Sequence, residues 1–129
     1  IGLVRTLQNT VQIEPNPQTF SYGNLFETFI INEIVRLNEY SRSRFEFSYL
    51  QVDNSSEIDL IVERPGKTTL LIEIKSTDSI SEKDIKSLER ISASFKHAKT
   101  LCLSRDKNRK KISNTLCLPW EEGIKEIFA

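Results

Sequence analysis

The chain has 129 residues, which is enough for one domain with a hydrophobic core of its own. Its 18 basic and 18 acidic residues balance, whereas proteins that bind nucleic acid mainly through phosphates carry a surplus of Lys and Arg. Tight autonomous binding of nucleic acid is therefore not expected. No apolar run approaches the roughly 20 residues that cross a bilayer, and no signal peptide is recognisable, so we expect no membrane association.

The first third of the sequence predicts a connector followed by a long helix. Residues 1–7 suggest a short helix or the end of one, and residues 8–22 form a connector broken by Pro15 and Pro17. From about residue 24 to residue 40 the apolar positions recur with helical period. These positions are Leu25, Phe26, Phe29, Ile30, Ile31, Ile34, Val35 and Leu37.

Two acidic residues, Glu27 and Glu33, fall within the apolar sector of this helix. A carboxylate on a buried stripe is costly unless it has a partner. Either residue is then an edge position that pairs with a surface base, or it has a function. The sequence alone does not decide between the two.

Three strands are predicted next, over residues 45–52, 58–62 and 70–76. The turn at residues 64–67 contains Pro65 and Gly66, which predicts an antiparallel hairpin of the second and third strands. Side chains alternate along a strand, so Ile72 and Ile74 point to one face, and Glu73 and Lys75 to the other.

The rest of the chain predicts a second helix, two strands and a last helix. Ser81 with Asp84 three residues on resembles a capping box, and the helix runs to about residue 96. Strands at residues 100–103 and 112–118 and a helix at 119–128 follow. A helix crossing between the third and fourth strands predicts an α/β fold with a mixed sheet flanked by helices.

The hairpin brings Asp59 within reach of Glu73 and Lys75 at one end of the sheet. Mg²⁺ prefers oxygen ligands and keeps several waters, so two carboxylates and the backbone carbonyl of Ile74 suffice to hold it. Lys75 beside the metal would orient or deprotonate a water molecule. The simpler interpretation is a cross-strand ion pair on a solvated face of the sheet.

The stretch from residue 105 to residue 111 is strongly basic. It predicts either a solvated turn between strands or a local patch that binds nucleic acid. The basic residues are Arg105, Lys107, Arg109, Lys110 and Lys111.

Other residue types that often carry chemistry are not arranged for it. Cys102 and Cys117 lie in separate apolar segments without metal-ligand spacing, so we expect buried, reduced thiols in a cytoplasmic protein. The single histidine, His97, is interpreted as a surface residue. No Gly-rich phosphate loop is present, so nucleotide binding by this chain is not expected.

The acids and the lysine resemble the motif of the PD-(D/E)xK phosphodiesterase superfamily. That motif has an acid on the second strand, here Asp59, and Glu-x-Lys on the third, here Glu73-Ile74-Lys75. Many members, including archaeal Holliday-junction resolvases, add a glutamate from the preceding helix, where Glu27 stands. The resemblance implies a restriction-endonuclease-like fold and DNA cleavage with Mg²⁺ or Mn²⁺.

A longer resemblance covers almost the whole chain. It is similar to the C-terminal domain of many bacterial and archaeal AAA+ family ATPases. The matching stretches are residues 1–7, 23–30, 33–34, 57–59, 72–75 and 118–120. Gln51 departs from the pattern, since many relatives carry an arginine near that position.

This second resemblance implies one nuclease-like domain over residues 1–129, with a core at 23–129 and a connector at 1–22 from an upstream ATPase part. The expected partners are DNA, the ATPase module of the same chain and, in a homodimer, a second copy. The alternative to a nuclease is an inactive DNA-binding or protein-interaction module that regulates the ATPase.

Overall fold

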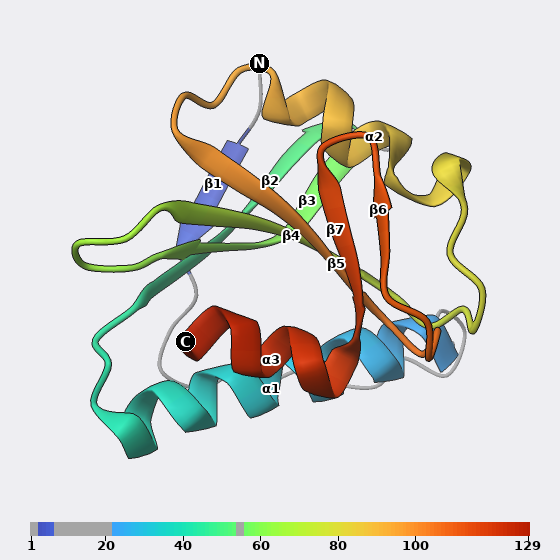
Figure 1. Cartoon of the computed structure of the whole chain (residues 1–129). Coiled ribbons are helices and arrows are strands. Elements are labelled where there is room, and N and C mark those ends of the chain that lie inside the picture. Colours follow the sequence, from blue (N-terminus) through green and yellow to red (C-terminus); the bar gives the residue numbers. More distant parts are fainter. Residues whose placement is uncertain (1–2, 7–21, 54–55) are drawn as a thin grey trace.

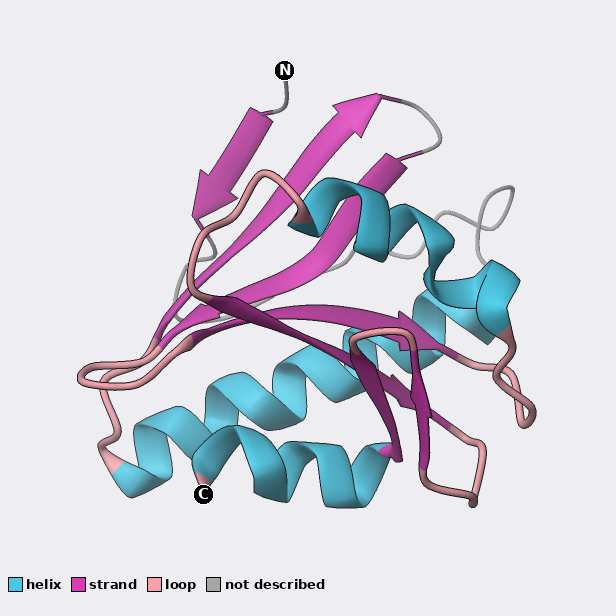
Figure 2. Cartoon of the chain, turned by 45° about the horizontal axis from the view of Figure 1, so that its top comes forward, coloured by secondary structure: helices cyan, strands magenta, loops and turns pink. Residues whose placement is uncertain are grey.

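A computed structural model describes residues 3–6, 22–53 and 56–129 of the chain. It has an α/β fold, in which a mixed seven-stranded sheet is covered by helices on both faces (Figures 1 and 2). Helices α1 (Tyr22–Ser41) and α3 (Trp120–Phe128) cover one face, and α2 (Glu82–Ser92) covers the other. The predicted fold class is confirmed.

The strands follow the order β1-β2-β3-β4-β5-β7-β6 across the sheet. Their bounds are β1 (Leu3–Thr6), β2 (Glu46–Asp53), β3 (Ser56–Glu63), β4 (Thr69–Lys75), β5 (Ala98–Ser104), β6 (Lys110–Ile112) and β7 (Thr115–Pro119). β4 pairs parallel to β5, and β5 parallel to β7, while the remaining pairs are antiparallel. The predicted β3–β4 hairpin and the crossover helix between β4 and β5 are therefore both present.

The two faces of the sheet bury different parts of the core. Leu60, Ile72 and Ile74 pack with apolar residues of α1 and α3. Leu71, which directly precedes Ile72 in β4, packs with Leu88 of α2. The alternation predicted for β4 is thus confirmed, and it places Glu73 on the α2 side. Because helices cover both faces, β4 is buried at every position between its two end residues.

The beginning of the chain differs from its prediction. Leu3–Thr6 is not helical but forms β1, which pairs antiparallel with β2. Part of the predicted connector therefore belongs to the sheet, because backbone pairing with an edge strand outweighs a weak local pattern. Residues 8–21 of that connector lie outside the described part of the chain, and α1 begins at Tyr22.

Two further predictions in the second half of the chain are wrong in part. α2 ends at Ser92, since the backbone N–H groups of Ser94 and Phe95 donate three residues back in a tighter turn. The expected single strand at residues 112–118 is instead the β6–β7 hairpin, which turns at Ser113, a residue with φ of +52°. Ser113 and Asn114 are residue types that favour turns, but without a glycine or proline this signal is weaker than the apolar pattern of the strand around it.

Candidate metal and phosphodiester site

The site begins where β3 and β4 separate. Their ladder of paired residues runs from Val62 opposite Leu70 to Leu60 opposite Ile72, and it ends there. Beyond that point Asp59 Oδ2 accepts a hydrogen bond of 2.8 Å from the backbone N–H of Ile74. The N–H of a strand points in the plane of the sheet toward its neighbour. The Asp59 carboxylate therefore lies between the two strands and takes the place of a backbone acceptor.

A β-bulge in β3 helps to aim this side chain. Ser48 lies opposite Ile61, but Leu50 lies opposite Ile58, so β3 contains one more residue than β2 between these pairs. Asp59 and Leu60 consequently both face Tyr49. A bulge bends the strand and redirects the side chains at that point. Here it lets Ile58 and Ile61 both reach the α2 side of the core.

Ile74 offers a third oxygen at the same place. Within a strand, the N–H and C=O of one residue point toward the same neighbouring strand. Since the N–H of Ile74 points to Asp59, its carbonyl oxygen faces the same opening between β3 and β4. The role of this carbonyl as a metal ligand stays a prediction.

Glu73 is the second buried carboxylate, with 7% of its surface exposed. Its Oε1 lies 3.2 Å from Lys75 Nζ, whereas its Oε2 is buried and has no hydrogen-bond partner among the residues that the structure describes. Burial and the nearby Glu57 outweigh the attraction of Lys75 and raise the pKa of Glu73 to about 7. A buried carboxylate oxygen without a partner is costly, so this oxygen is suited to accept a cation or a donor.

The electrostatics of Asp59 and Glu27 show that the acids lie close together. Burial raises the pKa of Asp59, and the charges of Glu73 and Glu27 raise it further. Burial also raises the pKa of Glu27 to about 7, with added repulsion from Glu57 and Glu73. Glu27 on α1 is thus near enough to these acids to feel their charge, and this repulsion makes its ionisation more costly.

Lys75 is the cation of this group. It is half-buried, which lowers its pKa, but the charge and hydrogen bond of Glu73 and the charge of Asp59 more than compensate. The net effect raises the pKa of Lys75. The side chain is therefore an ammonium held beside the carboxylates.

The other acid of the apolar sector has an ordinary explanation. Glu33 forms an ion pair with Arg36 one turn along α1, at the surface. This is the edge arrangement that the sequence left open for both acids. The structure separates them, because Glu27 is influenced by the buried acids and Glu33 by a surface base.

One acid near the site was missed. Glu57 is exposed on β3, and its charge raises the pKa of Glu27, Asp59 and Glu73. Its position two residues before Asp59, on the same face of a regular strand, was the signal that could have found it. Within the described ranges, no group of three or more His, Cys, Asp or Glu side chains has an arrangement that could hold a metal ion. The predicted ligand set needs only two carboxylates and a carbonyl.

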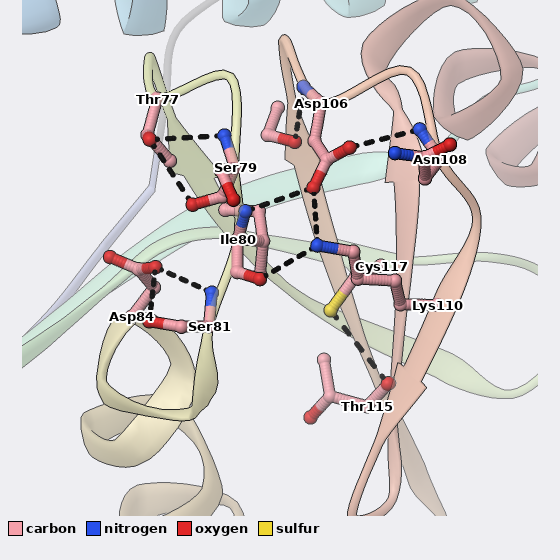
Figure 3. Close-up of polar contacts among 11 residues, drawn as sticks. Thr77, Ser79, Ile80, Ser81, Asp84, Asp106, Asn108, Lys110, Thr115 and Cys117 are labelled. Carbon is pink, nitrogen blue, oxygen red and sulfur yellow. Dashed lines mark hydrogen bonds and ion pairs between the residues drawn. The ribbon is translucent and has the colours of Figure 1, made fainter.

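The basic stretch contains an internal anchor (Figure 3). Asp106 is buried, and its carboxylate accepts hydrogen bonds from the backbone N–H groups of Ile80 and Asn108 and from Lys110 Nζ at 2.7 Å. The bond to Lys110 and those to the two backbone N–H groups lower the pKa of Asp106. Lys110 also donates to the carbonyl of Ile80, so it holds the β5–β6 loop against the segment before α2.

The other basic residues of the stretch lie at the surface. Lys107 and Lys111 are exposed, Arg105 is exposed at the end of β5, and Arg109 lies 3.4 Å from Glu122. Of the five residues predicted to bind nucleic acid, Lys110 has a clear structural role, because it bonds to both Asp106 and Ile80. For the other four residues, nucleic-acid binding stays a prediction.

The cysteines and the histidine are placed as expected. Cys102 and Cys117 are both free and buried, directly opposite one another on β5 and β7. His97 is exposed in a turn. No helix in the described part of the chain is long and apolar enough to cross a membrane.

Comparison with known proteins gives one match. A family model described as a domain of unknown function (DUF4143) matches residues 22–122, which include α1, the acids and the basic stretch. No curated protein and no solved structure matches the chain.

Proposed function

The chain belongs to the DUF4143 family, and we propose that it is a metal-dependent DNA phosphodiester hydrolase, a nuclease domain of a larger ATPase. The observation that carries the proposal is the pair of buried carboxylates. Asp59 is fixed by the N–H of Ile74, and Glu73 has a buried Oε2 for which the described part of the chain supplies no partner. Lys75 lies beside them.

The donor set fits a hard divalent cation. Asp59, Glu73 and the carbonyl of Ile74 offer only oxygen atoms, which are the ligands that Mg²⁺ and Mn²⁺ prefer. Both carboxylates are destabilised by burial, and Asp59 also by repulsion from Glu73. A cation would relieve both costs. When bound, Mg²⁺ would neutralise charge on a scissile phosphate and make a water molecule more acidic.

Two side chains would complete the reaction site. The Lys75 ammonium is oriented by Glu73 Oε1, so its remaining protons can bind the attacking water or the phosphate oxygens as negative charge develops. Glu27 approaches from α1 and would hold the position of a water molecule or accept its proton. The core that buries Ile72 and Ile74 fixes the backbone on which Glu73 and Lys75 stand.

The test combines metal binding with cleavage. Mn²⁺ is titrated calorimetrically into the wild type and Glu73→Gln, and both are assayed on plasmid, single-stranded and branched DNA. We expect the wild type to bind Mn²⁺ and cleave, and Glu73→Gln to lose both properties. Glu63→Gln, which changes an exposed acid at the other end of β3, is the matched control and should behave as the wild type.

A wild type that takes up no Mn²⁺ and cleaves none of the three DNAs would overturn the nuclease proposal. DNA or ATPase binding that is equal in the wild type and Glu73→Gln would then assign the domain to a binding module.

A further inference from the structure

A pocket of about 490 Å³ lies beside the candidate site, at the first turns of α1. It is lined by Leu25, Phe26, Phe29, Arg105 and Trp120. Leu25 and Phe29 remain 48% and 46% exposed, which is high for large apolar side chains of a helix that faces a core. The rings of Phe29 and Trp120 meet edge to face, with centroids 5.5 Å apart.

The register of the sheet places this pocket on the same edge as Lys75. Lys75 lies opposite Ser104 of β5, and Ser104 lies opposite Pro119 of β7. The residues that follow Ser104 and Pro119 are Arg105 and Trp120, which line the pocket. Adjacent strands are about 4.8 Å apart, so roughly 10 Å separates β4 from β7 at this edge. Glu73 and Lys75 point to the α2 side of the sheet, whereas the pocket lies on the side of α1, so one extended ligand would reach both by crossing this edge.

Helix α1 joins the two places. Phe26 lines the pocket, and the next residue, Glu27, faces the acids of the site. The loop that carries Arg105 is held by the buried Asp106 and its bonds to Ile80 and Asn108 (Figure 3). The pocket therefore lies between helix α1 and a loop that the hydrogen bonds of Asp106 hold in place.

The chemistry of the lining selects a flat, apolar ring attached to an anionic backbone. Nucleobases stack on aromatic side chains and on the guanidinium plane of arginine. Exposed Lys107 follows Arg105 in the loop between β5 and β6, exposed Lys111 lies on β6, and both offer charge to phosphates. In a duplex both faces of a base are already stacked, so only an unpaired base is available for such a pocket.

We propose that this pocket binds an unpaired base of a DNA strand whose backbone crosses the carboxylates and Lys75. The inference rests on the proposed nuclease function and narrows its substrate to single-stranded DNA or to a strand with an unpaired end. In this proposal, Phe29 and Trp120 stack on the base, and Arg105 contacts both the base and a phosphate.

Trp120 is the single tryptophan of the chain, so its fluorescence reports the pocket directly. The full chain is titrated in EDTA with a single-stranded oligothymidine, with an abasic strand of the same length and charge, and with a blunt duplex. We expect oligothymidine to quench Trp120 and to bind about 10-fold more tightly than the abasic strand. Equal quenching and affinity for oligothymidine and the abasic strand would overturn the proposal.

Two variants test whether base-dependent binding takes place in this pocket. Phe29→Ala should weaken oligothymidine binding about 10-fold and leave abasic-strand binding unchanged. Tyr40→Ala removes an aromatic side chain that is 88% exposed near the end of the same helix, and should have no effect. Far-ultraviolet circular dichroism checks that both variants fold. If a variant does not fold, the comparison of oligothymidine with the abasic strand on the wild type still tests the proposal. Self-association of the wild type that Phe29→Ala abolishes, without base-dependent quenching, would assign the pocket to a second copy of the chain instead.

These measurements use no metal, so they are independent of cleavage. Cleavage with Mn²⁺ but no base-dependent quenching would contradict the pocket assignment and leave the nuclease proposal standing. Base-dependent quenching without cleavage would support the pocket and contradict the nuclease.

Discussion

The carboxylate of Asp59 accepts the backbone N–H of Ile74 at 2.8 Å, across the gap where β3 and β4 separate. One side chain thus satisfies a backbone donor and contributes negative charge to the site. The two roles respond differently to substitution. An asparagine keeps an oxygen that can accept the hydrogen bond, but it has no charge.

Asp59→Asn should therefore remain folded and lose Mn²⁺ binding and DNA cleavage together. Because the charge of Asp59 is buried beside Glu73, its removal should also raise the stability of the metal-free protein at pH 8. Thermal unfolding in EDTA and calorimetric titration of Mn²⁺ measure the two effects. Unchanged Mn²⁺ affinity would show that Asp59 is not a ligand.

Lys75→Ala separates catalysis from binding. The ammonium lies beside the carboxylates and is not a ligand, so its loss should slow cleavage by roughly 10²-fold or more. Affinity for Mn²⁺ should stay the same or rise slightly, because a neighbouring positive charge is removed. Lys99→Ala is the control, since Lys99 is exposed on β5 away from the site. Cleavage at the wild-type rate by Lys75→Ala would remove Lys75 from the mechanism.

The two acids of α1 should differ in function. Glu27→Gln should weaken cleavage or metal binding with little loss of stability, because Glu27 faces the buried acids. Glu33→Gln should leave cleavage unchanged, because Glu33 pairs with Arg36 at the surface. Both variants are compared in the same plasmid assay. A larger loss of cleavage from Glu33→Gln would show that Glu33, not Glu27, serves the site.

The stability of the folded protein should decrease with rising pH because Glu27 and Glu73 are buried acids. The pKa values of Glu27 and Glu73 rise from the ordinary 4.5 to about 7, so the folded chain binds protons more tightly than the unfolded chain between these values. The free energy of unfolding should therefore fall as pH rises from about 4.5 to 7, by on the order of 3 kcal/mol for each carboxyl.

Denaturant unfolding of the metal-free protein at several pH values measures this slope. Glu73→Gln should reduce the fall, and saturating Mn²⁺ at pH 8 should restore stability by mass action. A stability that rises with pH over this range in the metal-free wild type would contradict the buried, mutually repelling acids.

Packing of the last helix gives a prediction that does not involve the site. A Cβ atom at Gly123 of α3 would lie 2.5 Å from Leu103 Cγ, and Leu103 is fully buried. Gly123→Ala should lower the free energy of unfolding by about 1–3 kcal/mol through overpacking. Glu121→Ala, an exposed change on the same helix, should have a much smaller effect. Equal stability of the two variants would show that α3 can move away from β5.

Local patterns in the sequence were sufficient for much of the fold. The apolar period of α1, the capping of α2 by Ser81 and Asp84, and the alternation of β4 are properties of near neighbours in the chain. The Pro65-Gly66 turn likewise predicted the β3–β4 hairpin. This hairpin can pair in few registers. The sequence could therefore name Asp59, Glu73 and Lys75 as candidates for one site.

Tertiary structure decided what depends on distant partners. Leu3–Thr6 is a strand because β2 offers it a ladder, and Lys110 is structural because Asp106 and Ile80 lie beside it. Glu27 and Glu33 carry the same side chain on the same helix, and the acids of β3 and β4 distinguish Glu27 from Glu33. The bulge at Asp59 and Leu60 also depends on β2, since a bulge is a mismatch between two strands. Burial and the charges of residues far along the chain determine these features, and a sequence read locally contains neither.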